Sequence, residues 1–260
     1  MSARPKKSFG QHFLHERSYI ERIVKSISPR TDDFVVEIGP GEGALTFPLL
    51  RAAGKLTAIE LDTDLIPPLQ ANAASIGELS IIQADVLKVD FTALAQRVGV
   101  PRLRIAGNLP YYISSPILFH CVDHAAAIAD MHFMLQKEVV DRMAAEPGSK
   151  VYGRLSVMLQ LACRVEPLFD VPPGAFRPPP KVDSSVVRLI PLAAEERHDA
   201  DPERLHAIVK AAFAQRRKTL SNALRQLMDA DTIRVAEVDP KARAETLAPA
   251  DFVRLAKVSL

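Results

Sequence analysis

Short apolar runs of strand length alternate with amphipathic stretches over the first half of the chain. The apolar runs lie at 34–38, 56–59, 79–82, 103–106 and 131–135. Segments between them, such as 45–53 and 65–74, carry apolar residues at helical spacing. This alternation predicts a mostly parallel sheet with helices on both faces. Ligands bind such sheets beyond the carboxyl ends of the strands, so residues that follow each strand are the first candidates for a site.

The sequence changes character after residue 166, where prolines become frequent. Six prolines between positions 167 and 180 predict a loop that is neither a helix nor a central strand. The apolar run 184–190 then predicts a late strand, which Pro191 ends. We therefore expect the sheet to be completed only after this loop.

A polar and acidic stretch at 193–201 predicts a linker between two domains. The tripeptide Asp201-Pro202-Glu203 has the capping oxygen, the proline and the first-turn acid of a helix start. Helical apolar spacing follows it, and helical character continues to the last residue. The sequence thus predicts an α/β domain at 1–191 and a small α-helical domain at 192–260.

Composition narrows the classes of protein to consider. The chain is 48% hydrophobic and 25% charged, which is ordinary for a globular protein. Cys121 and Cys163 lie in apolar surroundings without disulfide or zinc spacing, so we expect buried thiols and no metal. No apolar run reaches membrane-spanning length, and the N-terminus has no signal-peptide core. These features predict a soluble cytoplasmic protein away from membranes, and nothing in them requires more than a monomer.

Basic residues are concentrated in two stretches, although the formal net charge is only +2. The first 30 residues contain seven Lys or Arg against two acids. Residues 204–228 contain six Lys or Arg and no acid. Such clustering indicates a localised surface for a polyanion such as RNA, although a run of charge is more often a solvated face.

The first predicted strand runs directly into a glycine-rich turn at 39–43, Gly-Pro-Gly-Glu-Gly. Glycines permit a tight turn and a close approach of the backbone to a ligand, and the helix that follows offers its N-terminus. Glu60 ends the second strand, where a carboxylate can accept hydrogen bonds from two ribose hydroxyls. A dinucleotide oxidoreductase, a methyltransferase and an ordinary tight turn all fit this pattern.

Polar residues also follow the third and fourth strands. Asp85 follows the third, where its carboxylate could accept from an exocyclic adenine amine, and Asn108 closes the fourth. With the glycine turn and Glu60, these side chains would surround a nucleoside pocket. Ala44 and Thr46 stand where the third glycine of G-x-G-x-x-G could lie, so a pyrophosphate-binding oxidoreductase is disfavoured.

These residues resemble the successive motifs of a class I methyltransferase, and Asn108-Leu109-Pro110-Tyr111 resembles the [DNS]-P-P-[YF] signature of amino-group methylases. More closely, the chain resembles the small-subunit (16S) ribosomal RNA adenine N6-dimethyltransferases, the KsgA/RsmA family. The matching motifs extend over nearly the whole chain, at 10–14, 108–114, 176–184 and 213–220. The large-subunit methylases of erythromycin resistance are relatives that resemble it less at Tyr112 and in the C-terminal basic stretch.

The resemblance implies a Rossmann-like class I methyltransferase domain, a small C-terminal α-helical domain and S-adenosylmethionine as methyl donor. It also implies dimethylation of two adjacent adenines near the 3′ end of 16S ribosomal RNA, in a precursor of the small ribosomal subunit, with a role in subunit biogenesis. The residues implied to contact the donor are His12, Leu14, Gly39, Glu60, Asp85 and Asn108. Many relatives have Asn in place of His12.

The tetrapeptide at 108–111 suits methylation of an adenine amino group, whose lone pair is delocalised into the ring. A protein that accepts hydrogen bonds from both N–H groups would stabilise this nitrogen as it becomes tetrahedral and positively charged. Asn108 offers a side-chain oxygen, Leu109 or Pro110 a backbone carbonyl, and Tyr111 a ring that can stack on the base. The reaction then needs positioning rather than a metal or a strong base. A plain strand-end turn with Tyr111 in the core is the alternative interpretation.

An adenine in a paired stem could not reach this pocket, so we expect an unpaired or flipped-out target. Phe176 is either a second wall of the adenine slot or a loop anchor in the core. A basic helix with Arg216, Arg217 and Lys218, together with the basic N-terminus, would contact phosphates.

Three other functions stay open. The chain could be a large-subunit methylase of the macrolide-resistance type, or an assembly factor whose methylation is secondary. A nicotinamide-dependent oxidoreductase is the third, but no hydride-handling residue stands out in the sequence. Each of the three would make a different use of the same RNA-facing or nucleoside-binding features.

Overall fold

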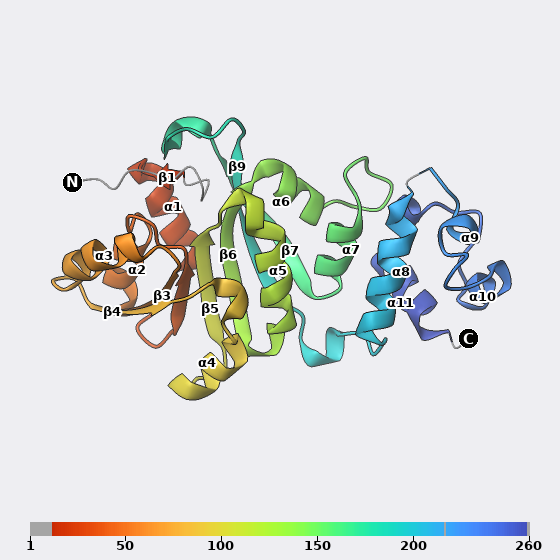
Figure 1. Ribbon diagram of the computed structural model, residues 1–260, viewed down its shortest axis with the longest axis horizontal. Helices are drawn as coiled ribbons and strands as arrows, with labels where there is room; N and C mark the ends of the chain where they lie inside the picture. The colour runs from red at the N-terminus through yellow and green to blue at the C-terminus, as the bar shows by residue number, and fades with distance from the viewer. Residues whose placement is uncertain (1–11, 216, 259–260) are drawn as a thin grey trace. The chain divides into compact units, whose positions relative to one another are not determined.

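The computed structural model describes residues 12–215 and 217–258, which divide into two compact units (Figure 1). The first extends as far as Val140 and also contains Glu166–Pro191, and the second contains Asp141–Val165 and the chain from Leu192 onward. The domains predicted at 1–191 and 192–260 stay a prediction, and the division into units differs from them by placing 141–165 with the C-terminal part of the chain. These residues pack with the C-terminal helices, a long-range partnership that local periodicity does not reveal.

The first unit is built on a seven-stranded sheet in the order β4-β3-β2-β5-β6-β9-β7. Its strands are β2 (Val35–Ile38), β3 (Lys55–Glu60), β4 (Glu78–Gln83), β5 (Leu103–Asn108), β6 (Ile128–Gln136), β7 (Cys163–Val171) and β9 (Ser184–Pro191). Strands β2 to β6 pair in parallel, and β9 pairs with β6 in the antiparallel sense. The five predicted strands of the first half and the late strand at 184–190 are confirmed.

Helices cover both faces of this sheet, as the alternation predicted (Figure 1). They are α1 (Arg17–Ile27), α2 (Thr46–Ala53), α3 (Ile66–Ala73), α4 (Phe91–Val98) and α5 (Ser114–Asp123), and α6 (Lys137–Met143) follows β6. Helices α1, α2 and α3 share one buried apolar cluster with residues from one face of the sheet, including Val35, Leu56 and Val186. Helices α4 and α5 lie on the opposite face, in front of the sheet in Figure 1.

The strand order places a topological switch point between β2 and β5. The chain leaves β2 for β3 and β4 on one side and then crosses back to β5 on the other. Gly107 allows these two strands to lie close together, because a Cβ at that position would come within 2.6 Å of the Ile38 carbonyl oxygen. The loops after β2 and β5 therefore diverge from a tightly packed pair of strands, which creates a crevice for a ligand.

Strand β7 corrects the prediction of a continuous loop from residue 167. It runs to Val171 and contains Pro167, but it lies at the end of the strand order. Proline is tolerated at a sheet edge because a position facing outward needs no ladder hydrogen bond from its nitrogen. The prolines therefore excluded a central strand, as predicted, without excluding an edge strand.

A separate two-stranded sheet joins β1 (Phe13–Leu14) to β8 (Phe176–Arg177) in the antiparallel sense. Leu14 lies opposite Phe176, and Phe13 lies opposite Arg177. More than 160 residues separate the two segments in the sequence, and neither strand was predicted. The pairing holds the N-terminal segment against the proline-rich loop, where His12 Nδ1 lies 2.7 Å from the Pro178 carbonyl oxygen.

Arg104 joins several elements near the start of β5. Its guanidinium donates to Asp130 on β6 at 2.8 Å and to Asp33 at 2.6 Å, and it also contacts the Ile27 carbonyl at the end of α1 at 2.7 Å. Asp130 is only 5% exposed, and Arg188 lies 3.6 Å from it as a second cation, so two guanidinium groups compensate this buried carboxylate. Both carboxylates hold the pKa of Arg104 above its ordinary value.

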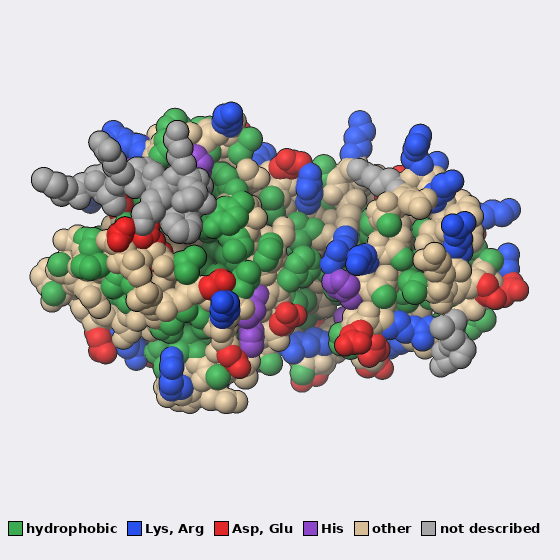
Figure 2. All heavy atoms as spheres, viewed as in Figure 1, with side chains coloured by type: hydrophobic (Ala, Val, Ile, Leu, Met, Phe, Trp, Pro, Cys, Tyr) green, Lys and Arg blue, Asp and Glu red, His purple; other side chains and the backbone are tan. Residues whose placement is uncertain are grey.

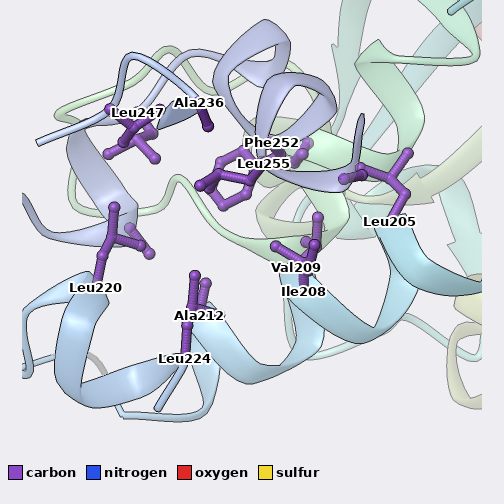
Figure 3. Close-up of a cluster of buried hydrophobic side chains, with 14 of the residues drawn as sticks. Leu205, Ile208, Val209, Ala212, Leu220, Leu224, Ala236, Leu247, Phe252 and Leu255 are labelled. Carbon is purple, nitrogen blue, oxygen red and sulfur yellow. The ribbon is translucent and has the colours of Figure 1, made fainter. Parts of the chain in front are cut away.

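The second unit is helical around its own apolar core. Its helices are α7 (Arg154–Gln160), α8 (Pro202–Ala214), α9 (Leu220–Ala223), α10 (Ala230–Val235) and α11 (Pro249–Lys257). Figure 3 shows Val209 of α8 and Leu220 of α9 turned toward Phe252 of α11 within one cluster. Asp201 caps α8 as predicted, accepting the backbone N–H of Arg204 at 2.7 Å.

Residues 141–165 contribute to this core through Tyr152. Its side chain is 2% exposed, and its hydroxyl donates to the Leu247 carbonyl at 2.8 Å. Cys121 and Cys163 are buried free thiols, as expected. Within 12–215 and 217–258, no helix has the length and apolarity needed to cross a membrane, and no cluster of His, Cys, Asp and Glu could hold a metal ion.

Candidate functional site

A cleft of about 1140 Å³, measured with its open mouth, lies in the first unit at the carboxyl ends of β2, β3 and β5. It occupies the position that the strand order predicts for a ligand. Nine of the residues predicted for the site line it, and they are His12, Leu14, Gly39, Glu60, Asp85, Asn108, Leu109, Pro110 and Tyr111. The structure thus brings together side chains that are up to 99 positions apart in the sequence.

The glycine turn forms one wall of the cleft in a conformation that other residues rarely adopt. Gly39, Gly41 and Gly43 have φ values of 68°, 57° and 89°. The backbone N–H of Gly41 donates to Glu60 Oε2 at 3.3 Å, and that of Asp62 donates to Glu60 Oε1 at 2.8 Å. These bonds fix the Glu60 carboxylate at the end of β3, while burial raises its pKa. Each oxygen keeps a second lone pair that can accept a hydroxyl.

Glu37 is a site residue that the sequence reasoning did not single out. It lies on β2, lines the cleft and is 1% exposed. Burial raises its pKa to about 8, and the nearby Glu60 charge adds to the shift. Within the described residues, its Oε2 atom has no hydrogen-bond partner. An acid inside an otherwise apolar strand, Val-Val-Glu-Ile, was the signal that could have identified it.

Asp85 lies two residues beyond β4 and caps a short 3-10 helix, η3 (Val86–Lys88). Its Oδ1 atom accepts the Leu87 backbone N–H at 3.0 Å. This contact fixes the orientation of the carboxylate on the cleft wall. The second oxygen, Oδ2, is then suitably placed to act as an acceptor for an amine.

Asn108 is oriented by the N-terminal segment. Its amide Nδ2 donates to the His12 backbone carbonyl at 3.1 Å. Because the two amide atoms diverge from one carbon, this bond directs Oδ1 away from that carbonyl. The next residue, Leu109, is anchored by its N–H to the Met134 carbonyl at 3.1 Å. The Pro110 carbonyl already accepts the Ile113 N–H at 3.2 Å, which makes the Leu109 carbonyl the better candidate as a second acceptor.

Tyr111 is held at three points. Its hydroxyl lies 2.6 Å from the Ser184 hydroxyl of β9, and its carbonyl accepts the Ser114 hydroxyl at 3.1 Å. The His12 ring stacks near it, with centroids 5.7 Å apart and planes 27° apart. With His12 on one side, a base could stack only against the remaining face. Ser184, which is fully buried, is a further positioning residue that its motif alone did not reveal.

Phe176 does not line the cleft. It is 2% exposed and packs in the same apolar cluster as Leu14, Met134 and Val171. Its pairing with β1 turns the side chain into the core. The structure therefore favours the loop-anchor interpretation, and the prediction of Phe176 as a wall of the adenine slot is corrected.

The predicted phosphate contacts are only partly described. Arg216 and the basic residues of the first 11 positions lie outside the described residues. Arg217 and Lys218 are exposed, but they lie in a turn and not in the predicted basic helix, because α8 ends at Ala214 and Gln215 leaves helical geometry. Figure 2 shows Lys and Arg side chains gathered over the visible face of the second unit.

Comparison with known proteins identifies similar chains. A family model described as ribosomal RNA adenine dimethylase matches residues 2–259. A curated protein of Xanthomonas oryzae pv. oryzae named ribosomal RNA small subunit methyltransferase A is 64% identical over 257 residues, covering 99% of this chain and 97% of that protein.

Two solved structures have a similar fold. A dimethyladenosine transferase from Plasmodium falciparum superimposes with a TM-score of 0.80 at 26% identity, covering 94% of this chain and 96% of the other. The 23S ribosomal RNA methyltransferase ErmE superimposes with a TM-score of 0.71, also at 26% identity, covering 94% and 98%. The fold is thus shared with a dimethyladenosine transferase and with a methyltransferase named for 23S ribosomal RNA.

Proposed function

The chain belongs to the ribosomal RNA adenine dimethylase family, a group of S-adenosylmethionine-dependent methyltransferases, and on that basis we propose that it dimethylates adenine N6 in small-subunit ribosomal RNA. The observation that carries this proposal is that one cleft combines the glycine turn, two fixed carboxylates and the Asn108–Tyr111 segment. The choice of the small subunit rests on the 64% identity to the Xanthomonas protein, since the ErmE fold is similar.

The residues on the β2, β3 and β4 side of the cleft fit the methyl donor. Glu60 can accept ribose hydroxyls, and the free oxygen of Asp85 can accept the adenine amine. The unpartnered oxygen of Glu37 could receive a hydrogen bond from a polar group of the donor. Within the turn at 39–43, the space beside Gly39 is open, so a ligand can approach the backbone closely there, whereas the Phe13 and Phe47 side chains pack against Gly41 and Gly43. When bound, the donor supplies a methyl group already activated by its sulfonium charge.

The residues after β5 orient the adenine. Asn108 Oδ1 and the Leu109 carbonyl would accept hydrogen bonds from the two N–H groups of the amino group, which would direct the nitrogen lone pair toward the methyl group of a bound donor. Tyr111 stacks on the base with the face that His12 leaves open. As the nitrogen forms its new bond it becomes positive, and the two acceptors stabilise that charge. The nitrogen then loses a proton to water, so no strong base is required.

The second unit would contact the RNA backbone. Its surface carries exposed basic side chains, among them Arg217 and Lys218, which can contact phosphates without reading sequence. The target adenine must be unpaired or flipped out to enter the cleft. We further propose a precursor of the small subunit as substrate and two adjacent adenines near its 3′ end as targets.

The function is tested with purified small subunits that lack dimethyladenine and a donor labelled in its methyl group. Wild-type protein should label small-subunit RNA, and the Asn108→Ala variant should be about 100-fold slower or worse, since it loses an acceptor in the transition state. Asn72→Ala is the matched control, because Asn72 is exposed on α3 away from the cleft.

Two results would contradict the proposal. Full activity in Asn108→Ala, with the fold intact by circular dichroism, would contradict the role of that acceptor. Label that appears only in large-subunit RNA would contradict the substrate. Loss of methylation with unchanged subunit binding in Asn108→Ala would separate methyl transfer from a role in assembly.

A further inference from the structure

We propose that Tyr112 is a stacking platform for the nucleotide next to the target adenine, an inference that rests on the proposed function. Tyr112 is 62% exposed, and it is the single aromatic residue among the large hydrophobic side chains that are exposed in the described parts of the chain. It also lines the mouth of the cleft beside the segment that carries Asn108. Single exposed apolar residues are ordinary on a protein surface, so what distinguishes this ring is its position beside the cleft.

The backbone around Tyr112 forms a hydrogen-bonded turn. The 3-10 turn η4 (Tyr111–Ile113) is closed by the Ile113 N–H to the Pro110 carbonyl at 3.2 Å, and α5 follows directly. Such a turn has about three residues per turn, so the side chains of Tyr111 and Tyr112 project about 120° apart. Tyr111 is fixed to Ser184 inside the cleft, and Tyr112 is therefore directed toward its rim.

This arrangement matches the geometry of a flipped-out base and its neighbour. When one adenine enters the cleft, the adjacent base loses a stacking partner. An aromatic ring held at the rim can replace that partner, and Tyr has only two side-chain torsions to fix, so little entropy is lost. Because the ring lies on one side of the cleft and the strand has one polarity, it would stack on the neighbour at one side only, 5′ or 3′, of whichever adenine is being methylated.

The other exposed apolar residue that lines the cleft has a different position. Leu61 is 52% exposed and follows Glu60 directly, so it belongs to the donor side of the cleft. Tyr112 lies on the segment that receives the base. Donor binding should therefore be insensitive to Tyr112, and RNA affinity should depend on it.

The test is a coupling experiment between Tyr112 and the neighbouring base. Small subunits are reconstituted with RNA that carries an abasic nucleotide on either the 5′ or the 3′ side of a target adenine. On intact RNA, Tyr112→Ala should raise the KM for subunits about 5- to 150-fold, with kcat and donor affinity little changed. On one of the two abasic RNAs the same variant should have little further effect, because the stacked base is already gone.

Three further measurements test whether the effect comes from the aromatic ring of Tyr112. Tyr112→Phe retains the ring and should behave like wild type. Leu168→Ala removes an exposed apolar side chain on β7, outside the cleft, and should leave the KM unchanged. When 2-aminopurine replaces the neighbouring base, wild-type protein should quench its fluorescence by stacking and Tyr112→Ala should not.

Equal losses on intact and both abasic RNAs would overturn the platform, as would a loss of donor affinity in Tyr112→Ala measured by calorimetry. If wild-type protein leaves intact small subunits unmethylated, the proposed function itself is wrong. If wild-type protein is active but the effects of Tyr112→Ala and of the abasic nucleotide are independent, the proposed platform is wrong and the proposed function stands.

Discussion

Glu37 should make the stability of the first unit fall as the pH rises. Its carboxyl is 1% exposed on β2, and burial raises its pKa to about 8 from an ordinary value of 4.5. Between these two values the folded protein holds a proton on Glu37 that the unfolded chain has released. Folding then binds a proton, so each rise in pH favours the unfolded chain. The Glu37→Gln variant removes this titration and keeps the shape of the side chain.

The size of the effect follows from the shift. At about 1.4 kcal/mol per pKa unit, a change from 4.5 to about 8 corresponds to roughly 5 kcal/mol of lost stability above pH 8. Below the unfolded value of 4.5 the penalty vanishes, because both states are protonated. The stability of Glu37→Gln relative to wild type should therefore increase by up to that amount across this window.

Urea unfolding of both proteins at a series of pH values between about 5 and 9 measures this difference directly. Glu195→Gln is the matched control, since Glu195 is exposed in a turn of the second unit. Its difference from wild type should stay near zero throughout. A flat difference curve for Glu37→Gln would refute the reasoning, because it would mean that Glu37 has the same proton affinity in both states.

Three other substitutions test the packing of the two units. Gly107→Ala should destabilise the protein by about 1–3 kcal/mol and reduce methylation, because its Cβ would lie 2.6 Å from a β2 carbonyl. Gly174→Ala is the control, because it has open space around it and should leave the melting temperature unchanged. Arg104→Met should cost up to about 3–5 kcal/mol in urea unfolding, because buried Asp130 loses its nearer cation and keeps only the 3.6 Å pair with Arg188, and a second change, Asp130→Asn, should recover part of the loss. Asp201→Ala should cost about 1 kcal/mol by removing the cap of α8, and an unchanged urea midpoint would contradict that role.

The parts of the fold that were predictable are those encoded by local pattern. Strands β2 to β6 are apolar runs between helical segments, and the turn at 39–43 is encoded by its glycines. Because parallel strands end at the same edge of a sheet, the residues after them could be assembled into one site before any coordinates were known. The cleft contains these predicted residues for that reason.

What the sequence did not reveal depends on contacts between distant segments. The β1–β8 pairing joins segments too short to show any periodicity, and it decides that Phe176 faces the core. The Ser184 hydroxyl becomes a partner of Tyr111 only because β9 lies next to β6 in the sheet. Pro167 by itself favours a loop, and it is tolerated in β7 only because β7 is an edge strand, which the local sequence does not encode.

The second unit is built from two separate segments of the chain, and this affects how it can fold during synthesis on the ribosome. Tyr152 emerges 95 residues before Leu247, whose carbonyl accepts its hydroxyl. Helix α11, with Phe252 and Leu255 in the same core, is translated after β7, β9 and α8. The apolar side chains of the segment 141–165 therefore stay uncovered until α11 has been translated. During this time β7 and β9 are translated and can already join the sheet. In a nascent chain stalled before α11, the segment 141–165 should be cleaved by protease and should bind chaperones. Once α11 has been translated and released, both the cleavage and the chaperone binding should stop.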